Sequence, residues 1–177
     1  DGNTALVSNF SDRDVHFVDV SNPIHPRWVS SVTLPFLAED IAITDDGRFA
    51  LVTDGTFSNM LASISIASRT VADTLDLSPL AAQAVDVAPN GTVILADYFA
   101  GEVLALTIDD SGTLITPASR YTPTDAGLPW PLNVGVAPDG ETVIACHAFS
   151  DSVGIYQVTG PGKLAYRQLV TGVTGSG

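Results

Sequence analysis

The chain has 177 residues, 45% of them hydrophobic, and its mean hydropathy is +0.28. This is enough apolar surface for a folded core, which excludes intrinsic disorder, and no run approaches the roughly 18 apolar residues of a membrane span. Twenty acidic residues against seven basic ones give a net charge of −13. That charge repels phosphates and anionic headgroups, so we expect neither nucleic acid nor a membrane surface as partner.

Four Asp-Gly or Asn-Gly pairs punctuate the chain: Asp1-Gly2, Asp46-Gly47, Asn90-Gly91 and Asp139-Gly140. Each predicts a tight turn between antiparallel strands, because both residue types tolerate a positive φ angle. In chain order, alternating apolar residues predict strands at 5–9, 15–20 and 28–34, then at 40–44, 50–54, 61–66 and 70–77, then at 84–88, 93–97, 103–108 and 114–121, and finally at 133–137, 143–147, 153–158 and 164–170.

The order of these elements repeats along the whole chain. The repeats cover approximately residues 1–38, 39–82, 83–131 and 132–177 of one domain, and the first of them lacks its innermost strand. Four short antiparallel strands in each repeat are typical of a β-propeller blade. We therefore predict an all-β protein made of β-propeller blades.

The predicted strands do not show how the ring of blades is completed. The Gly-rich residues from Val170 onward would have to supply the missing inner strand of the first repeat. Without it, apolar faces between blades and strand edges would stay exposed. Three arrangements are open: missing blades in a larger propeller, a homodimer that completes the ring, or closure of the four repeats alone.

Aromatic residues mark the loops that follow the second strand of each repeat, namely Phe10, Phe57, Phe99 and Phe149. We expect them to pack over neighbouring blades, with a hydrophobic rim for a ligand as the alternative. Trp130 lies between two prolines at the end of a segment, 123–131, that predicts a rigid extended loop. It is the best candidate for a ligand-binding aromatic residue. The polar residues Glu39, Asp40 and Asn133 enter the same face and complete the predicted ligand-binding set.

Cys146 and His147 are adjacent and at first sight suggest a catalytic pair. Cys146 aligns with Ser8, Thr53 and Ala96, all of them small, so we predict a small core residue. As the sole cysteine it permits no internal disulfide. The sequence contains no nucleophile elbow and no identifiable partner base. Catalysis therefore has no recognisable constellation in this sequence.

The turn and second-strand motifs resemble the YVTN-type repeat of lactonase-like and surface-layer-associated β-propellers. The resemblance covers essentially the whole chain and rests on the turn Pro138-Asp139-Gly140, on strands ending in Ser8-Asn9 or Thr53-Asp54, on the strand that follows the loop, and on the first-repeat motif Val18-Asp19-Val20-Ser21-Asn22-Pro23. His147 departs from the Asn or Asp that ends the strand, and Asp45 departs from the Pro before Asp-Gly. The motifs are specific indicators of the fold, but they give little indication of the function.

The resemblance implies a divalent cation on the ring axis, held by residues of several blades. The equivalent strand-end residues here are Asn9, Asp54, Asp97 and His147. Oxygen ligands suit Ca²⁺, and the histidine would admit a transition metal. The alternative is that each side chain hydrogen-bonds the backbone of its own loop.

Two functions follow as hypotheses. The first is a non-catalytic binding or structural module that contacts a protein, a glycan or a small molecule through the loop face. The second is a lactonase-like hydrolase in which the axial metal polarises a carbonyl and activates water. The acidic composition leads us to expect an extracellular or periplasmic location.

Overall fold

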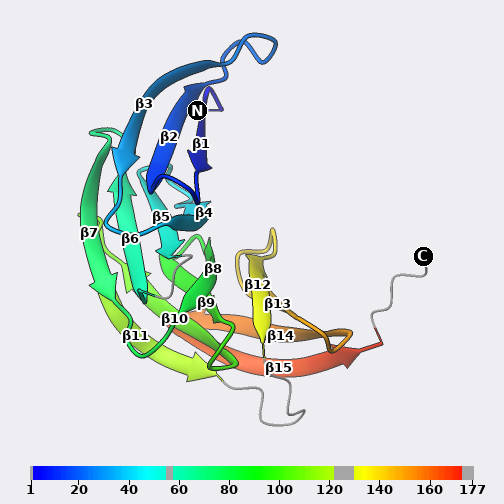
Figure 1. Ribbon diagram of the computed structural model, residues 1–177. Coiled ribbons are helices and arrows are strands. Elements are labelled where there is room, and N and C mark those ends of the chain that lie inside the picture. Colours follow the sequence, from blue (N-terminus) through cyan, green and yellow to red (C-terminus); the bar gives the residue numbers. More distant parts are fainter. Residues whose placement is uncertain (1, 55–57, 122–129, 173–177) are drawn as a thin grey trace.

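The structure is a computed structural model that describes residues 2–54, 58–121 and 130–172. These ranges contain β-strands joined by turns and loops, arranged as four antiparallel sheets along an arc (Figure 1). They hold no helix long and apolar enough to cross a bilayer. The predicted all-β class and the propeller-blade architecture are confirmed. Most of the Pro-rich segment at 123–131 lies outside the described ranges.

We call the sheets blades 1 to 4 in chain order. Blade 1 consists of β1 (Thr4–Ser8), β2 (Asp14–Asp19) and β3 (Arg27–Thr33). Blade 2 consists of β4 (Ala38–Ile43), β5 (Phe49–Asp54), β6 (Met60–Ser65) and β7 (Thr70–Asp76). Blade 3 consists of β8 (Ala82–Val87), β9 (Thr92–Asp97), β10 (Glu102–Ile108) and β11 (Leu114–Tyr121). Blade 4 consists of β12 (Pro131–Val136), β13 (Thr142–His147), β14 (Ser152–Gly160) and β15 (Lys163–Thr171).

Blades 2 to 4 each have four strands in sequential order, and blade 1 has three. The strands β4, β8 and β12 lie on the concave side of the arc, and β3, β7, β11 and β15 lie on its outside (Figure 1). Val170 belongs to β15, the outermost strand of blade 4. Within the described residues, the inner edge of β1 therefore carries no partner strand.

In the Asp-Gly and Asn-Gly turns, only the glycine adopts a positive φ angle. Gly47, Gly91 and Gly140 have φ angles of 70–78°, whereas the Asp or Asn before each keeps a negative φ. In blade 2 the Gly47 N–H donates to the Thr44 carbonyl, and Asp46 Oδ1 accepts the Arg48 N–H. Each turn is thus a type I turn followed by a left-handed glycine, and the preceding side chain caps the returning strand.

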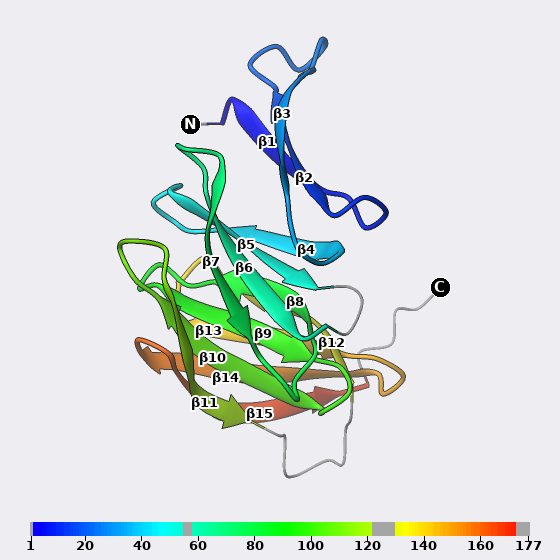
Figure 2. The ribbon, with the colours of Figure 1, turned by 60° about the vertical axis from the view of Figure 1, so that its left-hand side comes forward.

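The apolar core lies between blades. Three buried clusters occupy the boundaries of blades 1 and 2, 2 and 3, and 3 and 4, in the order in which the blades follow one another from top to bottom in Figure 2. In β5 and β9 all six residues are buried, because a neighbouring blade covers each face. In β13 exposed and buried residues alternate.

Polar bonds also join neighbouring blades near the concave side. The Val85 N–H of blade 3 donates to Asp40 Oδ2 of blade 2 over 3.0 Å. The Val136 N–H of blade 4 donates to Asp86 Oδ2 of blade 3 over 2.6 Å. A carboxylate that accepts a backbone N–H from the next blade fixes the two inner strands relative to each other.

The prediction that Cys146 is a core residue is wrong for this chain, because Cys146 is exposed. Its counterparts Thr53 and Ala96 are fully buried, because each faces the blade that follows in the chain. Cys146 lies on the face of β13 that turns away from blade 3. We call this the open face of blade 4; a shallow, mainly apolar hollow on it is lined by Asn133, Gly135, Ile144 and Cys146, among others.

Candidate functional site

Four aromatic side chains gather at one end of blades 3 and 4; we call them the aromatic cluster. Tyr98 and Phe99 follow β9, Trp130 precedes β12, and Phe149 follows β13. The ring of Tyr98 stacks on that of Trp130 with centroids 6.2 Å apart, and Phe149 meets Trp130 edge-on at 6.0 Å. Tyr98 and Phe99 form a second edge-on pair at 5.1 Å. Aromatic rings at these distances and angles attract one another.

The cluster is open to solvent. Phe149 is 88% exposed, Phe99 59% and Trp130 39%. The expectation that the loop phenylalanines pack over neighbouring blades is wrong for Phe99 and Phe149, and equally for the exposed Phe10; Phe57 lies outside the described residues. Phe10, Phe99 and Phe149 lie in loops at the ends of the sheets, directly after β1, β9 and β13. Trp130, the aromatic residue that the sequence analysis predicted to bind a ligand, belongs to this cluster. Its ring partner Tyr98 was not predicted.

The backbone under the cluster is unusual as well. Trp130 has a φ angle of 76° and Phe149 one of 60°. For bulky L-residues the left-handed region costs about 1–2 kcal/mol relative to the usual one. Such conformations persist where the surrounding structure determines them, and they concentrate at ligand-contacting sites.

The four predicted metal ligands lie at equivalent places in four blades. Asp54, Asp97 and His147 end the second strand of blades 2 to 4, each opposite the first residue of the inner strand, and Asn9 follows β1. Across the described ranges, the one group of three or more His, Cys, Asp or Glu side chains with donor atoms close together lies elsewhere. Joint coordination of an axial cation by the four strand-end residues stays a prediction.

Local hydrogen bonds occupy several of these side chains. Asp97 is fully buried; its Oδ1 accepts the N–H groups of Phe99 and Ala100, and its Oδ2 accepts that of Ala81. Asn9 Oδ1 accepts the Ser11 N–H, and Asp54 Oδ2 accepts the Ser58 hydroxyl. Asp97 therefore positions the loop that carries Tyr98 and Phe99.

The predicted polar ligand residues Glu39, Asp40 and Asn133 are distributed over two blades. In blade 2, burial raises the pKa of the Glu39 carboxyl, and the negative charges of Asp40 and Asp54 raise it further. Both carboxylate oxygens of Asp40 accept backbone N–H groups, from Ile41 and Val85. Asn133 lies on the open face of blade 4, paired across the sheet with Cys146. The structure thus brings Glu39 and Asp40 together and leaves Asn133 apart from them.

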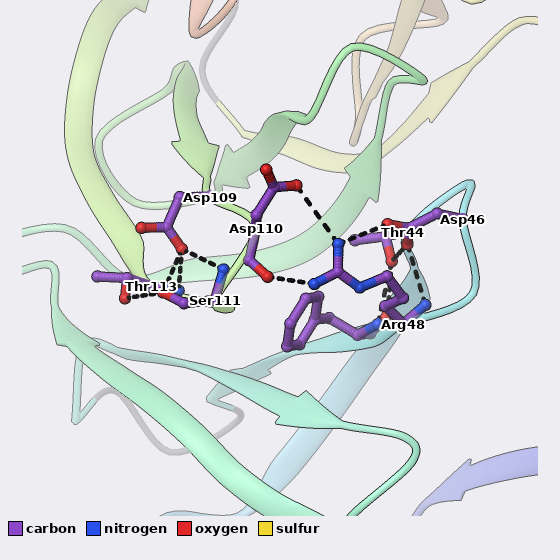
Figure 3. Close-up of polar contacts among 8 residues, drawn as sticks. Thr44, Asp46, Arg48, Asp109, Asp110, Ser111 and Thr113 are labelled. Atoms are coloured by element: carbon purple, nitrogen blue, oxygen red, sulfur yellow. Dashed lines mark hydrogen bonds and ion pairs between the residues drawn. The ribbon is translucent and has the colours of Figure 1, made fainter.

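A pocket of about 310 Å³ lies between the turns of blades 2 and 3, at the end of the sheets opposite the aromatic cluster. Arg48 lines this pocket and contacts both turns: Nη1 lies 3.3 Å from Asp110 Oδ1 and 3.6 Å from Asp46 Oδ2, and Nη2 donates to the Asp110 carbonyl. The dashed lines in Figure 3 mark these contacts. The guanidinium also lies over the Phe49 ring at 5.3 Å. Arg48 links two blades here, a role that its place directly after Asp46-Gly47 did not predict.

The turn carboxylates at this end have depressed pKa values. The Thr44 hydroxyl and then the Arg48 N–H lower the pKa of Asp46, and the Ser111 hydroxyl and backbone N–H groups of the same turn lower that of Asp109. Their oxygens already accept hydrogen bonds within their own turns (Figure 3). These carboxylates therefore stabilise turns.

Comparison with known proteins supplies the fold. No protein-family model and no curated protein sequence matches this chain. A protein of unknown function from Desulfotomaculum acetoxidans is 20% identical with a TM-score of 0.84, over 96% of this chain and 53% of that one. A candidate 6-phosphogluconolactonase from Bacteroides uniformis is 16% identical with a TM-score of 0.81, over 96% and 52%. The β-propeller domain of Cps50 (Swd1) from Myceliophteria thermophila is 14% identical with a TM-score of 0.72, over 97% and 56%.

These likenesses show a β-propeller fold of the kind found in lactonase-like proteins. The chain spans about half the length of the solved structures it matches. Identities of 14–20% carry no substrate or activity from those proteins to this one.

Proposed function

We propose that the protein is a non-catalytic binding module whose contact surface is the aromatic cluster. The single observation that carries this proposal is the open group of Tyr98, Trp130 and Phe149 rings, in which Trp130 and Phe149 have a backbone held in the left-handed region. Exposed aromatic rings that are already ordered offer contact area at a low cost in conformational entropy. A ligand with a flat apolar face, from a protein, a glycan or a small molecule, fits such a surface.

The test uses the tryptophans. Arrays of glycans and peptides are screened with the whole chain, and each hit is then measured with Trp130→Ala, Phe149→Ser and Trp28→Ala. Trp28 is exposed on blade 1, far from the cluster in sequence, and serves as the matched control. We expect the first two variants to weaken binding at least tenfold and Trp28→Ala to leave it unchanged. Binding that is insensitive to Trp130 and Phe149, or the absence of any hit, would overturn the proposal.

A lactonase-like hydrolase is the second candidate. The likeness to candidate 6-phosphogluconolactonases supports its consideration. In this hypothesis Asn9, Asp54, Asp97 and His147 hold Ca²⁺ or another divalent cation. Hydrolysis of lactones by the purified chain with added Ca²⁺, lost in Asp97→Ala and retained in Asp45→Ala, would support it. No turnover with any divalent cation would remove it.

We also propose that further blades complete the ring, either in a longer protein or in a second copy of this chain, outside the cytoplasm. Among the described residues, the open face of blade 4 and the edge of β1 without a partner strand support the further blades, as does the roughly twofold greater length of the matched structures. The acidic composition is the ground for the location. The molar mass in solution separates the cases. A dimer favours two copies, whereas a monomer that gains stability when neighbouring blades are co-expressed favours a longer protein.

A further inference from the structure

We propose that Asp12, Asp14 and His16 form a binding site for a divalent transition metal on blade 1. Each offers one donor atom, and these atoms all lie within 4.8 Å of one another. Asp12 Oδ2 and His16 Nε2 are 3.7 Å apart. Two ligand atoms on one tetrahedral zinc, each about 2.1 Å from it, lie about 3.4 Å apart. Small side-chain rotations therefore bring these donors onto a shared ion.

The donor set selects the class of metal. Two carboxylates alone would suit Ca²⁺ or Mg²⁺, which prefer oxygen ligands. The imidazole nitrogen of His16 shifts the preference toward Zn²⁺ and its neighbours among the first-row metals. Three protein ligands leave at least one coordination position for water.

The carboxylates are already oriented by neighbouring groups. The side-chain amide of Asn9 donates to Asp12 Oδ2 over 2.7 Å, and the Asp14 N–H donates to Asp12 Oδ1 over 3.0 Å. The Thr33 hydroxyl of β3 donates to Asp14 Oδ1 over 2.6 Å. Such outer bonds to ligand carboxylates are a regular part of metal sites.

The imidazole of His16 supplies a separate indication. Its Nδ1 is shielded from solvent and has no hydrogen-bond partner among the described residues. Its Nε2 faces Asp12 across 3.7 Å, which is longer than a hydrogen bond. The side chain is three-quarters covered, with 25% exposure. A metal ion shared with Asp12 would bind Nε2, the ring nitrogen that faces Asp12 without a hydrogen bond to it.

Comparison of the blades makes the position of His16 more informative. Val15 and Phe17 are buried toward blade 2, so Asp14 and His16 lie on the opposite face of β2. In blades 2 and 3 the residues equivalent to His16 are Ala62 and Leu104, both fully buried against the preceding blade. At the position of His16, blade 1 thus carries an ionisable donor where blades 2 and 3 carry apolar core residues.

The site is independent of the aromatic cluster, and of the residues predicted to bind a cation on the axis it touches only Asn9, which donates to Asp12. The test is a calorimetric titration of the metal-free full chain, in a Cys146→Ser background, with Zn²⁺ and then with Co²⁺, whose visible absorption reports the ligand geometry. We expect one equivalent to bind, and His16→Ala and Asp14→Asn each to weaken binding at least tenfold. His25→Ala and Asp45→Asn, which alter exposed residues outside the site, should bind as the parent does.

Two outcomes would overturn the proposal. One is the absence of stoichiometric binding in the parent. The other is binding that His16→Ala leaves intact and Asp97→Ala abolishes, which would place the metal at the predicted axial residues. Circular dichroism and urea unfolding of each variant exclude loss of fold as the cause of weaker binding.

Discussion

Strands β9 and β13 hold the same place in successive blades, yet their surroundings differ. Every residue of β9 is buried, whereas exposed and buried residues alternate along β13. Ile94 and Ile144 are equivalent isoleucines, and the first is 0% exposed while the second is 38% exposed. Ile94 packs in the cluster between blades 3 and 4, and Ile144 lies on the open face of blade 4. Burial in this fold is therefore set by the neighbouring blade more than by the strand itself.

The largest effect that tests this comparison is truncation of the two isoleucines. Ile94→Ala should lower the free energy of unfolding by about 2–5 kcal/mol, because it leaves a cavity between two packed sheets. Ile144→Ala should lower it by less than about 1 kcal/mol, because the side chain is partly in solvent. Urea unfolding of both variants measures the difference. Equal losses would mean that the open face of blade 4 is covered in solution.

A second, smaller difference is expected at the strand ends. Asp97→Ala removes a buried acceptor of three backbone N–H groups and should cost about 1–3 kcal/mol. Asn9→Ala, the equivalent change in blade 1, removes one such acceptor at an exposed loop and should cost less. Thermal unfolding compares the two. A larger loss for Asn9 would contradict the view that inner blades depend more on these caps.

Acid sensitivity should distinguish the turns. The Thr44 hydroxyl lowers the pKa of Asp46, and the Thr142 hydroxyl lowers that of Asp139, each below 3.8, while Asn90 in blade 3 cannot titrate. A folded-state pKa below the unfolded value stabilises the protein above about pH 3.8, and this stabilisation is lost as pH falls through the folded value. The Asp46→Asn/Asp139→Asn double variant should therefore show a shallower fall in unfolding free energy on acidification. Asp45→Asn serves as control, and an unchanged slope in the double variant would contradict the assignment.

The smallest perturbation uses the thiol as a probe. Cys146 should react with a thiol reagent in the native protein, because it is exposed. A cysteine placed at the equivalent position of blade 3, as Ala96→Cys in a Cys146→Ser background, should react only after unfolding, because Ala96 is fully buried. Reaction rates with a chromogenic disulfide measure both. Protection of Cys146 in the native chain would show that another surface covers it.

Local signals predicted the strands and turns well. The second strand of the second repeat was expected at 50–54, and β5 covers Phe49–Asp54. The innermost strand of the third repeat was expected from residue 84, and β8 begins at Ala82. The register of β8 against β9 shifts between Ala82 and Ala84. An irregularity of this kind depends on the partner strand, so alternation along a single segment does not reveal it.

The candidate site was predictable only in part. Trp130 could be singled out because its flanking prolines place it in a loop. Its contact with Tyr98 joins loops of different blades, which no short-range pattern reports. Cys146 is exposed because no blade among the described residues covers that face of β13, and a single strand's sequence does not show this. The sequence did not single out His16, which lies in a strand, because its nearness to Asp12 and Asp14 shows only in the placement of their side chains.

The location of the apolar clusters between sheets has a consequence for folding cooperativity. No blade has an interior of its own, so each is stable only to the extent that a neighbour couples to it, as in a one-dimensional chain of interacting units. Among the described residues, blades 1 and 4 each share one apolar cluster with a neighbour, whereas blades 2 and 3 share two. Amide hydrogens should therefore exchange first at the two ends of the arc and last around β5 and β9. A fragment of this fold would lose structure by fraying inward from its ends.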